Sequence, residues 1–151
     1  MTRDYDQLFD EVQPQVLIID DEPGLVDLLR RFLELENIPA IGFSRPLEAL
    51  RWFEDHFEHT KVVVLDLKMP RHDGRECLEV LKDIDPDVEV AIFSGVPGIS
   101  ERPPEDPAIC RVFQKPVDLT VIVRWVARQV RRRSAVVHLP NMASPSVVKG
   151  S

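Results

Sequence analysis

Residues 62–74, VVVLDLKMPRHDG, contain the features that decide the fold. The first four residues form an unbroken β-branched and aliphatic run, which is typical of a strand covered on both faces. Asp66 follows directly, so a carboxylate is expected where this strand ends. Pro70 and Gly74 favour a turning loop after it. The segment therefore predicts a buried strand that delivers a carboxylate to one edge of a sheet.

Similar short runs alternate along the chain with longer segments of helical period. The expected strands lie at 16–19, 38–43, 62–65, 88–93 and 111–114. The expected helices lie at 25–35, 47–57, 78–84 and 118–133. Parallel strands need crossover connections, and these connections are right-handed. The pattern therefore predicts an α/β fold, a doubly wound five-stranded parallel sheet with helices on both faces.

One stretch opposes a regular fourth crossover helix. Four prolines lie between the last two expected strands, at Pro97, Pro103, Pro104 and Pro107. A proline inside a helix costs about 3 kcal/mol. Any helix in this segment is expected to be short, irregular or displaced.

The 151 residues suit one domain with short tails. Residues 15–133 form the expected domain, and 134–151 an extended or disordered tail. In residues 1–14, the apolar positions Tyr5, Leu8, Phe9 and Val12 have the spacing of a short amphipathic helix. Two cysteines in no metal or disulfide pattern are interpreted as buried free thiols.

Composition excludes some classes of protein. No apolar run reaches the roughly 20 residues that span a bilayer, and the polar N-terminal segment is unlike a secretory signal, so a cytoplasmic protein is expected. The net charge of −7 argues against direct nucleic-acid binding. Arginines near the end of the last helix are interpreted as a solvated helix end, with a binding patch as the alternative.

Reactive side chains stand where four of the expected strands end. Asp20 and Asp21 follow VLII, Asp66 follows VVVL, Ser94 follows VAIF, and Lys115 ends the fifth strand. The carboxyl ends of parallel strands share one sheet edge, so these residues should converge. Clustered carboxylates repel one another unless a hard cation binds, and Mg²⁺, or Mn²⁺, suits oxygen ligands. Each residue alone is more often a helix cap or a solvated side chain.

The combination is more specific. The segments VLIIDDEPG, VVVLDLKMPRHDG, VAIFSG and VFQKP closely resemble, in order and spacing, the signature segments of the receiver domain of two-component response regulators. The resemblance extends over residues 15–133 and is closest to chemotaxis-regulator-like, single-domain receivers. It implies a flavodoxin-like strand order 2-1-3-4-5 and a switch based on a phosphorylated aspartate.

The resemblance also implies roles for site residues. Asp66 matches the phosphoacceptor and a metal ligand, Asp21 matches a direct metal ligand, and Asp20 matches a neighbour that acts largely through water. Lys68 matches the position whose backbone carbonyl binds the metal. The family takes its phosphoryl group from a sensor histidine kinase or a histidine phosphotransfer protein. It signals through this modification and is not a turnover enzyme.

Two further residues match groups that contact the phosphoryl. Lys115 matches the lysine that binds it, and Ser94 matches the hydroxyl that moves toward it after transfer. The position that often carries Tyr or Phe is Val112 here, with Phe113 next, which puts the usual aromatic toggle in doubt.

Two other functions remain as alternatives. A receiver-like binding module that signals without phosphate is compatible with Val112 and the proline-rich segment. A Mg²⁺-dependent phosphohydrolase of the haloacid-dehalogenase type would want a second Asp at the position of Lys68.

Self-association through the last helix and the N-terminal segment is a further prediction. On a helical wheel Val121 and Trp125 fall away from the buried stripe, so both are expected to be exposed. An exposed Trp rimmed by Arg residues has the composition of an interface centre.

Overall fold

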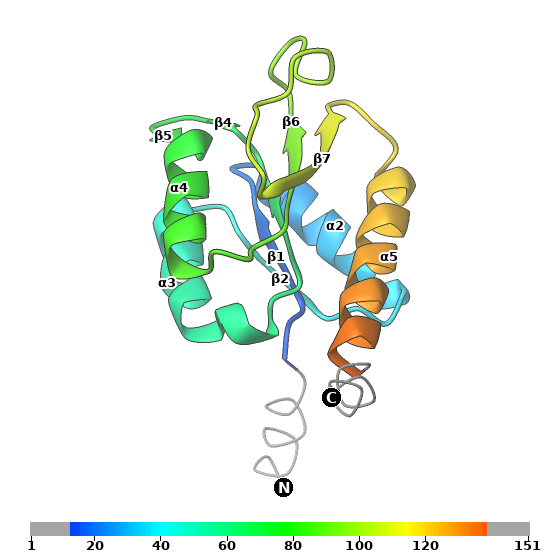
Figure 1. Cartoon of the computed structure of the whole chain (residues 1–151). Helices are drawn as coiled ribbons and strands as arrows, with labels where there is room; N and C mark the ends of the chain where they lie inside the picture. Colours follow the sequence, from blue (N-terminus) through cyan, green and yellow to red (C-terminus); the bar gives the residue numbers. More distant parts are fainter. Residues whose placement is uncertain (1–12, 139–151) are drawn as a thin grey trace, which may run out of the picture.

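A five-stranded parallel sheet forms the centre of the molecule (Figure 1). The computed structural model describes residues 13–138, so the predictions about the N-terminal segment before Gln13 and the tail after His138 lie outside the described residues. The strands are β1 (Val16–Ile19), β2 (Ala40–Phe43), β3 (Val62–Leu65), β6 (Val90–Ser94) and β7 (Ile109–Gln114). Their order is β2-β1-β3-β6-β7, which is 2-1-3-4-5 when the five parallel strands are counted along the chain. The predicted flavodoxin-like fold is confirmed.

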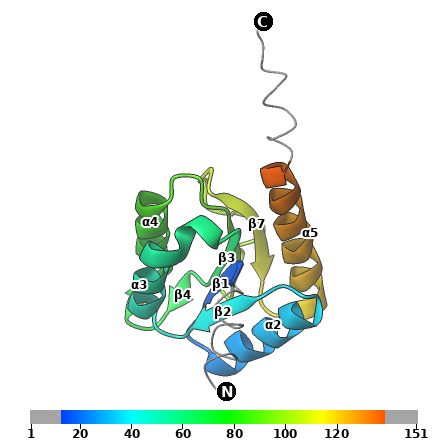
Figure 2. The ribbon, with the colours of Figure 1, turned by 90° about the horizontal axis from the view of Figure 1, so that it is seen from below.

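Two layers of helices cover the sheet (Figures 1 and 2). The helices are α2 (Pro23–Leu35), α3 (Pro46–His56), α4 (Gly74–Ile84) and α5 (Leu119–His138), and a 3-10 turn, η1 (Phe57–His59), follows α3. α2 packs beside α5 on one face, and α3 packs beside α4 on the other. α5 continues five residues past its predicted end at Arg133.

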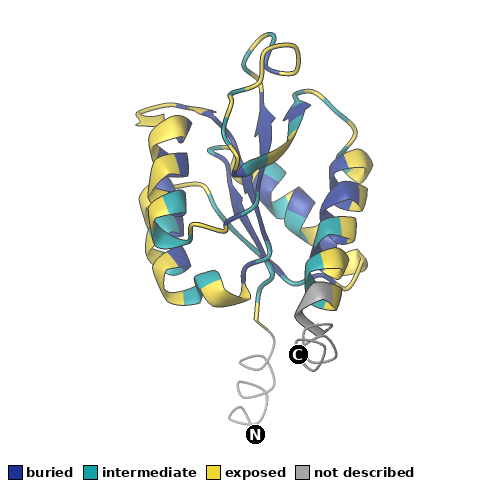
Figure 3. Cartoon of the chain, viewed as in Figure 1, coloured by how far each residue is buried: buried dark blue, intermediate teal, exposed yellow. Residues whose placement is uncertain are grey.

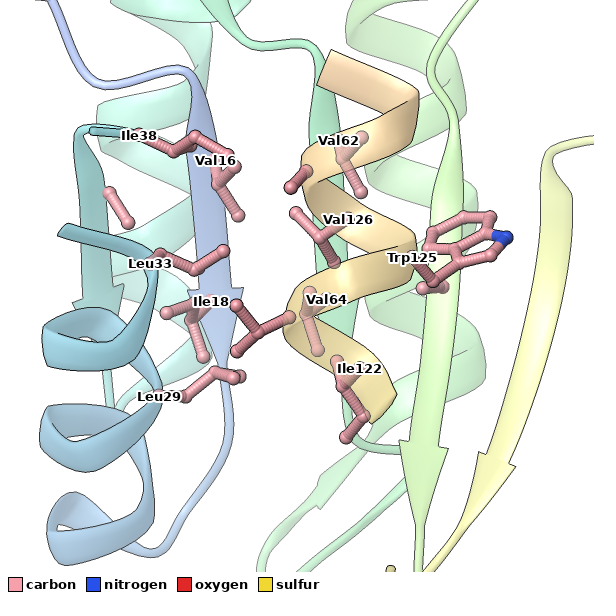
Figure 4. Packing of buried hydrophobic residues seen from close by; sticks show 14 of the residues in the cluster. Val16, Ile18, Leu29, Leu33, Ile38, Val62, Val64, Ile122, Trp125 and Val126 are labelled. Carbon is pink, nitrogen blue, oxygen red and sulfur yellow. The ribbon is translucent and has the colours of Figure 1, made fainter. Parts of the chain in front are cut away.

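Burial explains why the central strands have unbroken apolar sequences. Every residue of β1, β3 and β6 is buried, because helices cover both faces of these strands (Figure 3). Alternate side chains enter two separate cores. In the core beneath α2 and α5, Ile18, Leu29 and Ile122 are almost completely buried (Figure 4). This packing holds the carboxyl ends of the strands at one sheet edge.

The segment between β6 and β7 contains turns but no helix, as its prolines predict. Ile99 anchors it in the core with 3% of its surface exposed. Near its end, Lys82 on α4 donates a 2.7 Å hydrogen bond to Asp106. The Asp106 carboxylate also accepts a hydrogen bond from the backbone N–H of Ala108. An ion pair and a few apolar contacts therefore hold the segment that replaces the helix.

The structure corrects the prediction that Trp125 is exposed. Only 7% of its surface is accessible, whereas Val121 is 43% exposed as predicted. The indole extends from α5 on the side away from α2 (Figure 4) and meets the ring of Phe113 edge to face at 5.9 Å. Trp125 lies on the flank of the buried stripe, and the edge strand β7 supplies a cover that a wheel of one helix omits. Cys110 is also exposed, against expectation, while Cys77 is buried.

Most of the arginines near the end of α5 already have partners. Arg131 pairs with Glu36, and both Arg132 and Arg133 pair with Glu89. These pairs favour the solvated helix end over a binding patch.

Candidate functional site

Strand ends deliver the predicted site residues to one edge of the sheet. Asp20 and Asp21 follow β1, Asp66 follows β3, and Lys115 follows β7. Backbone hydrogen bonds continue the strand pairing at these positions. The N–H of Asp66 donates to Ile19 at 3.0 Å, and the N–H of Lys115 donates to Ser94 at 2.8 Å. Sheet pairing therefore fixes the backbone on which the reactive side chains stand.

Three carboxylates meet within this edge. One oxygen each from Asp20, Asp21 and Asp66 lies within 4.8 Å of the others. Asp20 and Asp66 are both 3% exposed, and Asp21 is half-buried. Asp21 and Asp66 line an open pocket of about 430 Å³, together with Glu22, Lys68, Met69, Pro70, Gly95 and Lys115.

Lys115 is the cation that faces these carboxylates. Its Nζ lies 2.8 Å from Asp20 Oδ2 and 3.3 Å from Asp66 Oδ2. It also lies 3.0 Å from Glu22 Oε1 and 5.1 Å from the centre of the Phe93 ring. Burial alone would lower the pKa of Lys115, but hydrogen bonds to Asp20 and Glu22 outweigh it and raise that pKa. Lys115 therefore stays charged at neutral pH.

The burial of Asp20 has an electrostatic cost. Burial raises the pKa of Asp20 to about 6, against the hydrogen bonds from Lys115 and the backbone of Glu22, which lower it. The charge of Asp66 adds to the rise. A divalent cation would relieve this cost, because it favours the charged forms of neighbouring carboxylates.

The donor set fits a hard divalent cation. One oxygen from each of Asp20, Asp21 and Asp66 lies within 4.8 Å of the others, so these carboxylates could face a single bound cation. All the clustered ligand atoms are carboxylate oxygens, which Mg²⁺ and Mn²⁺ prefer. The cluster is compatible with magnesium binding.

The loop after β3 shapes the pocket. Lys68 donates its backbone N–H to Asp66 Oδ1 at 3.0 Å, and its side chain is exposed. The short strands β4 (Lys68–Met69) and β5 (His72–Asp73) pair across a turn in which Arg71 has a φ of 66°. Proline before a residue of positive φ is the pattern of a type II turn. Gly74 then begins α4, pressed against the backbone of Asp66 and Leu67.

Ser94 lies at the end of β6 and is completely buried. Its hydroxyl accepts a 3.3 Å hydrogen bond from the backbone N–H of Val96, and Gly95 forms the adjoining pocket wall. The structure therefore brings Asp20, Asp21, Asp66 and Lys115 together, with Ser94 bound to the following loop. Sequence reasoning missed Glu22. Its place directly after the Asp pair was a usable signal, since the same loop carries it to the same edge.

The comparisons with known proteins agree with this arrangement. The family model for the response regulator receiver domain matches residues 16–124. The chain belongs to the receiver domain family. Receiver domains are signalling domains of two-component systems that interact with histidine kinases or phosphotransfer proteins and bind Mg²⁺ at an acidic pocket.

Individual relatives support the same family. The chain is 32% identical to "Probable transcriptional regulator ycf27" of Porphyridium aerugineum over 133 residues, which cover 84% of this chain and 53% of that protein. It thus spans about half the length of this relative and of several other curated relatives that it matches.

In the part of the chain that the structure describes, no helix is long and apolar enough to cross a membrane.

Solved structures share the fold of this receiver domain. One receiver domain protein from Clostridium thermocellum has a TM-score of 0.68 at 23% identity, over 82% of this chain and 98% of that chain. The response regulator TrrA from Thermotoga maritima, crystallised with Mg²⁺ and BeF, has a TM-score of 0.64 at 21% identity. That alignment covers 78% of this chain and 99% of that one.

Proposed function

We propose that this receiver domain accepts a phosphoryl group on Asp66, from a histidine kinase or a histidine phosphotransfer protein, with Mg²⁺ bound beside it. One observation carries the proposal: the buried Asp66 carboxylate lines an open pocket, lies 3.3 Å from Lys115 and clusters with two further aspartates. Family membership supports it, as does the Mg²⁺ and BeF complex of the similar Thermotoga maritima regulator.

The proposed transfer is a displacement at phosphorus. An oxygen of Asp66 forms a new O–P bond while the P–N bond of phosphohistidine, or the P–O bond of acetyl phosphate, breaks. The imidazole or acetate leaves with the bonding electrons. Lys115 pairs with the oxygens of the moving group, so its ammonium offsets charge where charge develops. Little acid-base chemistry is required of the protein.

The metal would be held by the carboxylates of Asp21 and Asp66 and the backbone carbonyl of Lys68, with Asp20 acting largely through water. When bound, Mg²⁺ supplies positive charge to the phosphoryl oxygens. Asp21 is suited to direct ligation because it is only half-buried and lines the pocket. Asp20 lies farther inside, hydrogen-bonded to Lys115 and the backbone of Glu22.

In the proposed readout, the Ser94 hydroxyl moves from the N–H of Val96 to a phosphoryl oxygen. Val96 begins the proline-rich segment, so this exchange would act on the loop that replaces a helix. The signal then changes association with a partner or with a second copy. A cytoplasmic location is part of the proposal, and the receiver itself is not expected to contact nucleic acid.

The proposed self-association through α5 would use Val121, which is exposed, and not Trp125, which is buried. Light scattering at tens of micromolar, with and without beryllofluoride as a phosphoryl mimic, tests it. The substitution Val121→Asp should weaken any dimer without lowering stability. A wild-type chain that is monomeric in both conditions rejects the dimer.

The experiment for the main proposal is incubation with acetyl phosphate and Mg²⁺, followed by intact-mass analysis. One added phosphoryl group is expected, and Asp66→Asn or removal of Mg²⁺ should abolish it. A phosphoryl group located on Ser94 or a histidine would reject the assignment.

A second candidate is a receiver-like module that signals without phosphate. Two observations favour it: Val112 stands where an aromatic residue is common, and the segment after β6 forms no helix. A protein that takes no phosphoryl from acetyl phosphate or phosphoramidate would support this candidate.

A further inference from the structure

All three hydrogen-bond donors of the Lys115 ammonium are matched by carboxylates. Lys115 Nζ lies 2.8 Å from Asp20, 3.0 Å from Glu22 and 3.3 Å from Asp66. An ammonium group has three donors and no more. Before the bond to Asp66 forms, all three carboxylates are still charged, so an oxygen of the arriving phosphoryl group can take one of these donors only if a carboxylate releases it.

Burial identifies the carboxylate that is easiest to release. The side chains of Asp20 and Asp66 are 4% and 3% exposed, and both also accept backbone hydrogen bonds, from Glu22 and Lys68. The side chain of Glu22 is 60% exposed. An exposed carboxylate that loses its partner regains water, whereas a buried one does not. Glu22 is therefore the most solvent-exposed of the three, and it also lines the pocket.

We propose that Glu22 is a positioning residue, which holds the Lys115 ammonium in a resting position until Lys115 exchanges Glu22 for a phosphoryl oxygen. The exchange rests on the proposed phosphorylation of Asp66, whereas the resting contact does not. Glu22 thus restrains acceptance of the phosphoryl group. It acts through the lysine and does not touch the reacting atoms.

The kinetic test compares rates of phosphorylation by acetyl phosphate, followed by intact mass at saturating Mg²⁺. The ion pair between Glu22 and Lys115 is partly exposed, so its loss should have a modest effect. Glu22→Gln should therefore accelerate the reaction roughly twofold to fivefold. Glu48→Gln removes an equal charge from the exposed surface of α3 and should leave the rate unchanged. An unchanged or slower rate in Glu22→Gln overturns the proposal.

A second comparison separates positioning from simple repulsion between Glu22 and an anionic donor. If Glu22 acts through Lys115, the acceleration disappears when Glu22→Gln is combined with Lys115→Ala, because the two effects are coupled. If Glu22 only repels the donor, the same acceleration persists without the lysine. Persistence would overturn the positioning role.

An NMR measurement tests the resting contact without phosphorylation. In ¹⁵N spectra selective for lysine ammonium groups, Glu22→Gln should shift and mobilise the Lys115 signal. Glu79→Gln is the matched control, because Glu79 bonds Lys82 at 3.2 Å and should alter only the Lys82 signal. An unaltered Lys115 signal in Glu22→Gln overturns the inference. An altered signal in a protein that never accepts phosphoryl supports the contact and rejects the proposed function instead.

Discussion

Gly74 lies so close to Asp66 that a β carbon at position 74 would stand 2.5 Å from the Asp66 carbonyl oxygen. It would also stand 2.4 Å from the α carbon of Leu67. Both neighbours are backbone atoms, so neither can rotate away. The start of α4 is thus pressed against the backbone of Asp66, the proposed phosphoacceptor, and only glycine permits this approach.

The substitution Gly74→Ala should therefore destabilise the fold by about 1–3 kcal/mol, the usual range for an overpacked site. It should also displace Asp66 and slow phosphorylation. Urea unfolding measures the first effect, and intact mass after acetyl phosphate treatment measures the second. Gly24→Ala is the control, since its new β carbon meets nothing within 4 Å and helix propensity favours alanine by less than about 1 kcal/mol. Equal stability of the two variants would contradict the steric argument.

Metal binding should require Asp21 but not Lys115. Asp21→Asn would remove a proposed anionic ligand from a site with few others, so Mg²⁺ affinity should fall by about tenfold or more, which corresponds to about 1.4 kcal/mol. Lys115→Ala should retain or improve Mg²⁺ affinity, because the ammonium that pairs with Asp20 and Asp66 is removed, yet it should impair phosphorylation. Isothermal titration calorimetry measures the Mg²⁺ affinity of both variants, and intact mass after acetyl phosphate treatment measures phosphorylation of Lys115→Ala. An unaltered affinity in Asp21→Asn would refute its role as a ligand.

The ion pair between Lys82 and Asp106 should stabilise the fold at neutral pH, and this contribution should be lost at acidic pH. Hydrogen bonds from Lys82 and from the backbone of Ala108 hold the pKa of Asp106 below its usual 3.8. A carboxyl group whose pKa is lowered on folding stabilises the protein above the unfolded pKa, and that contribution is lost as pH falls through the folded pKa. The melting temperature of the wild type should therefore exceed that of Lys82→Ala at pH 7, and the difference should shrink as pH falls below about 4.

Circular dichroism melts between pH 7 and pH 3 measure this difference. The double variant Lys82→Ala/Asp106→Ala is the control. Its melting temperature should change less with pH than that of the wild type over the same range. A Lys82→Ala deficit that is constant with pH would argue against the ion pair.

Trp125 should contribute to stability and not to an exposed interface. Truncation of a buried Trp typically costs about 3–5 kcal/mol, so Trp125→Ala should lower the free energy of unfolding by this order. Trp125→Phe should cost less, because an aromatic ring can still meet Phe113. Denaturant unfolding of both variants provides the measurement. If Trp125→Ala unfolds at the same urea concentration as the wild type, the burial of the indole is incorrect.

Much of the fold and site followed from local sequence patterns. Unbroken apolar runs such as 62–65 identify strands that are buried on both faces, and parallel strands bring their carboxyl ends to one edge. Asp20, Asp66 and Lys115 could therefore be placed near one another although the last two lie 49 residues apart. The prolines of the segment before β7 excluded a regular helix for an equally local reason, the missing N–H and the fixed φ.

Contacts between elements were decided only by the tertiary structure. A helical wheel describes the faces of α5 but not the width of the sheet beneath it, so it could not predict that Phe113 on β7 covers Trp125. The sequence placed Glu22 beside Asp20 and Asp21 but did not reveal its contact with Lys115, 93 residues away. Side chains choose among several nearby partners according to distance, burial and competing charge, and these quantities exist only once distant segments have packed. The sequence by itself determined which groups reach the edge of the sheet, and the packed chain decided which of them bind one another.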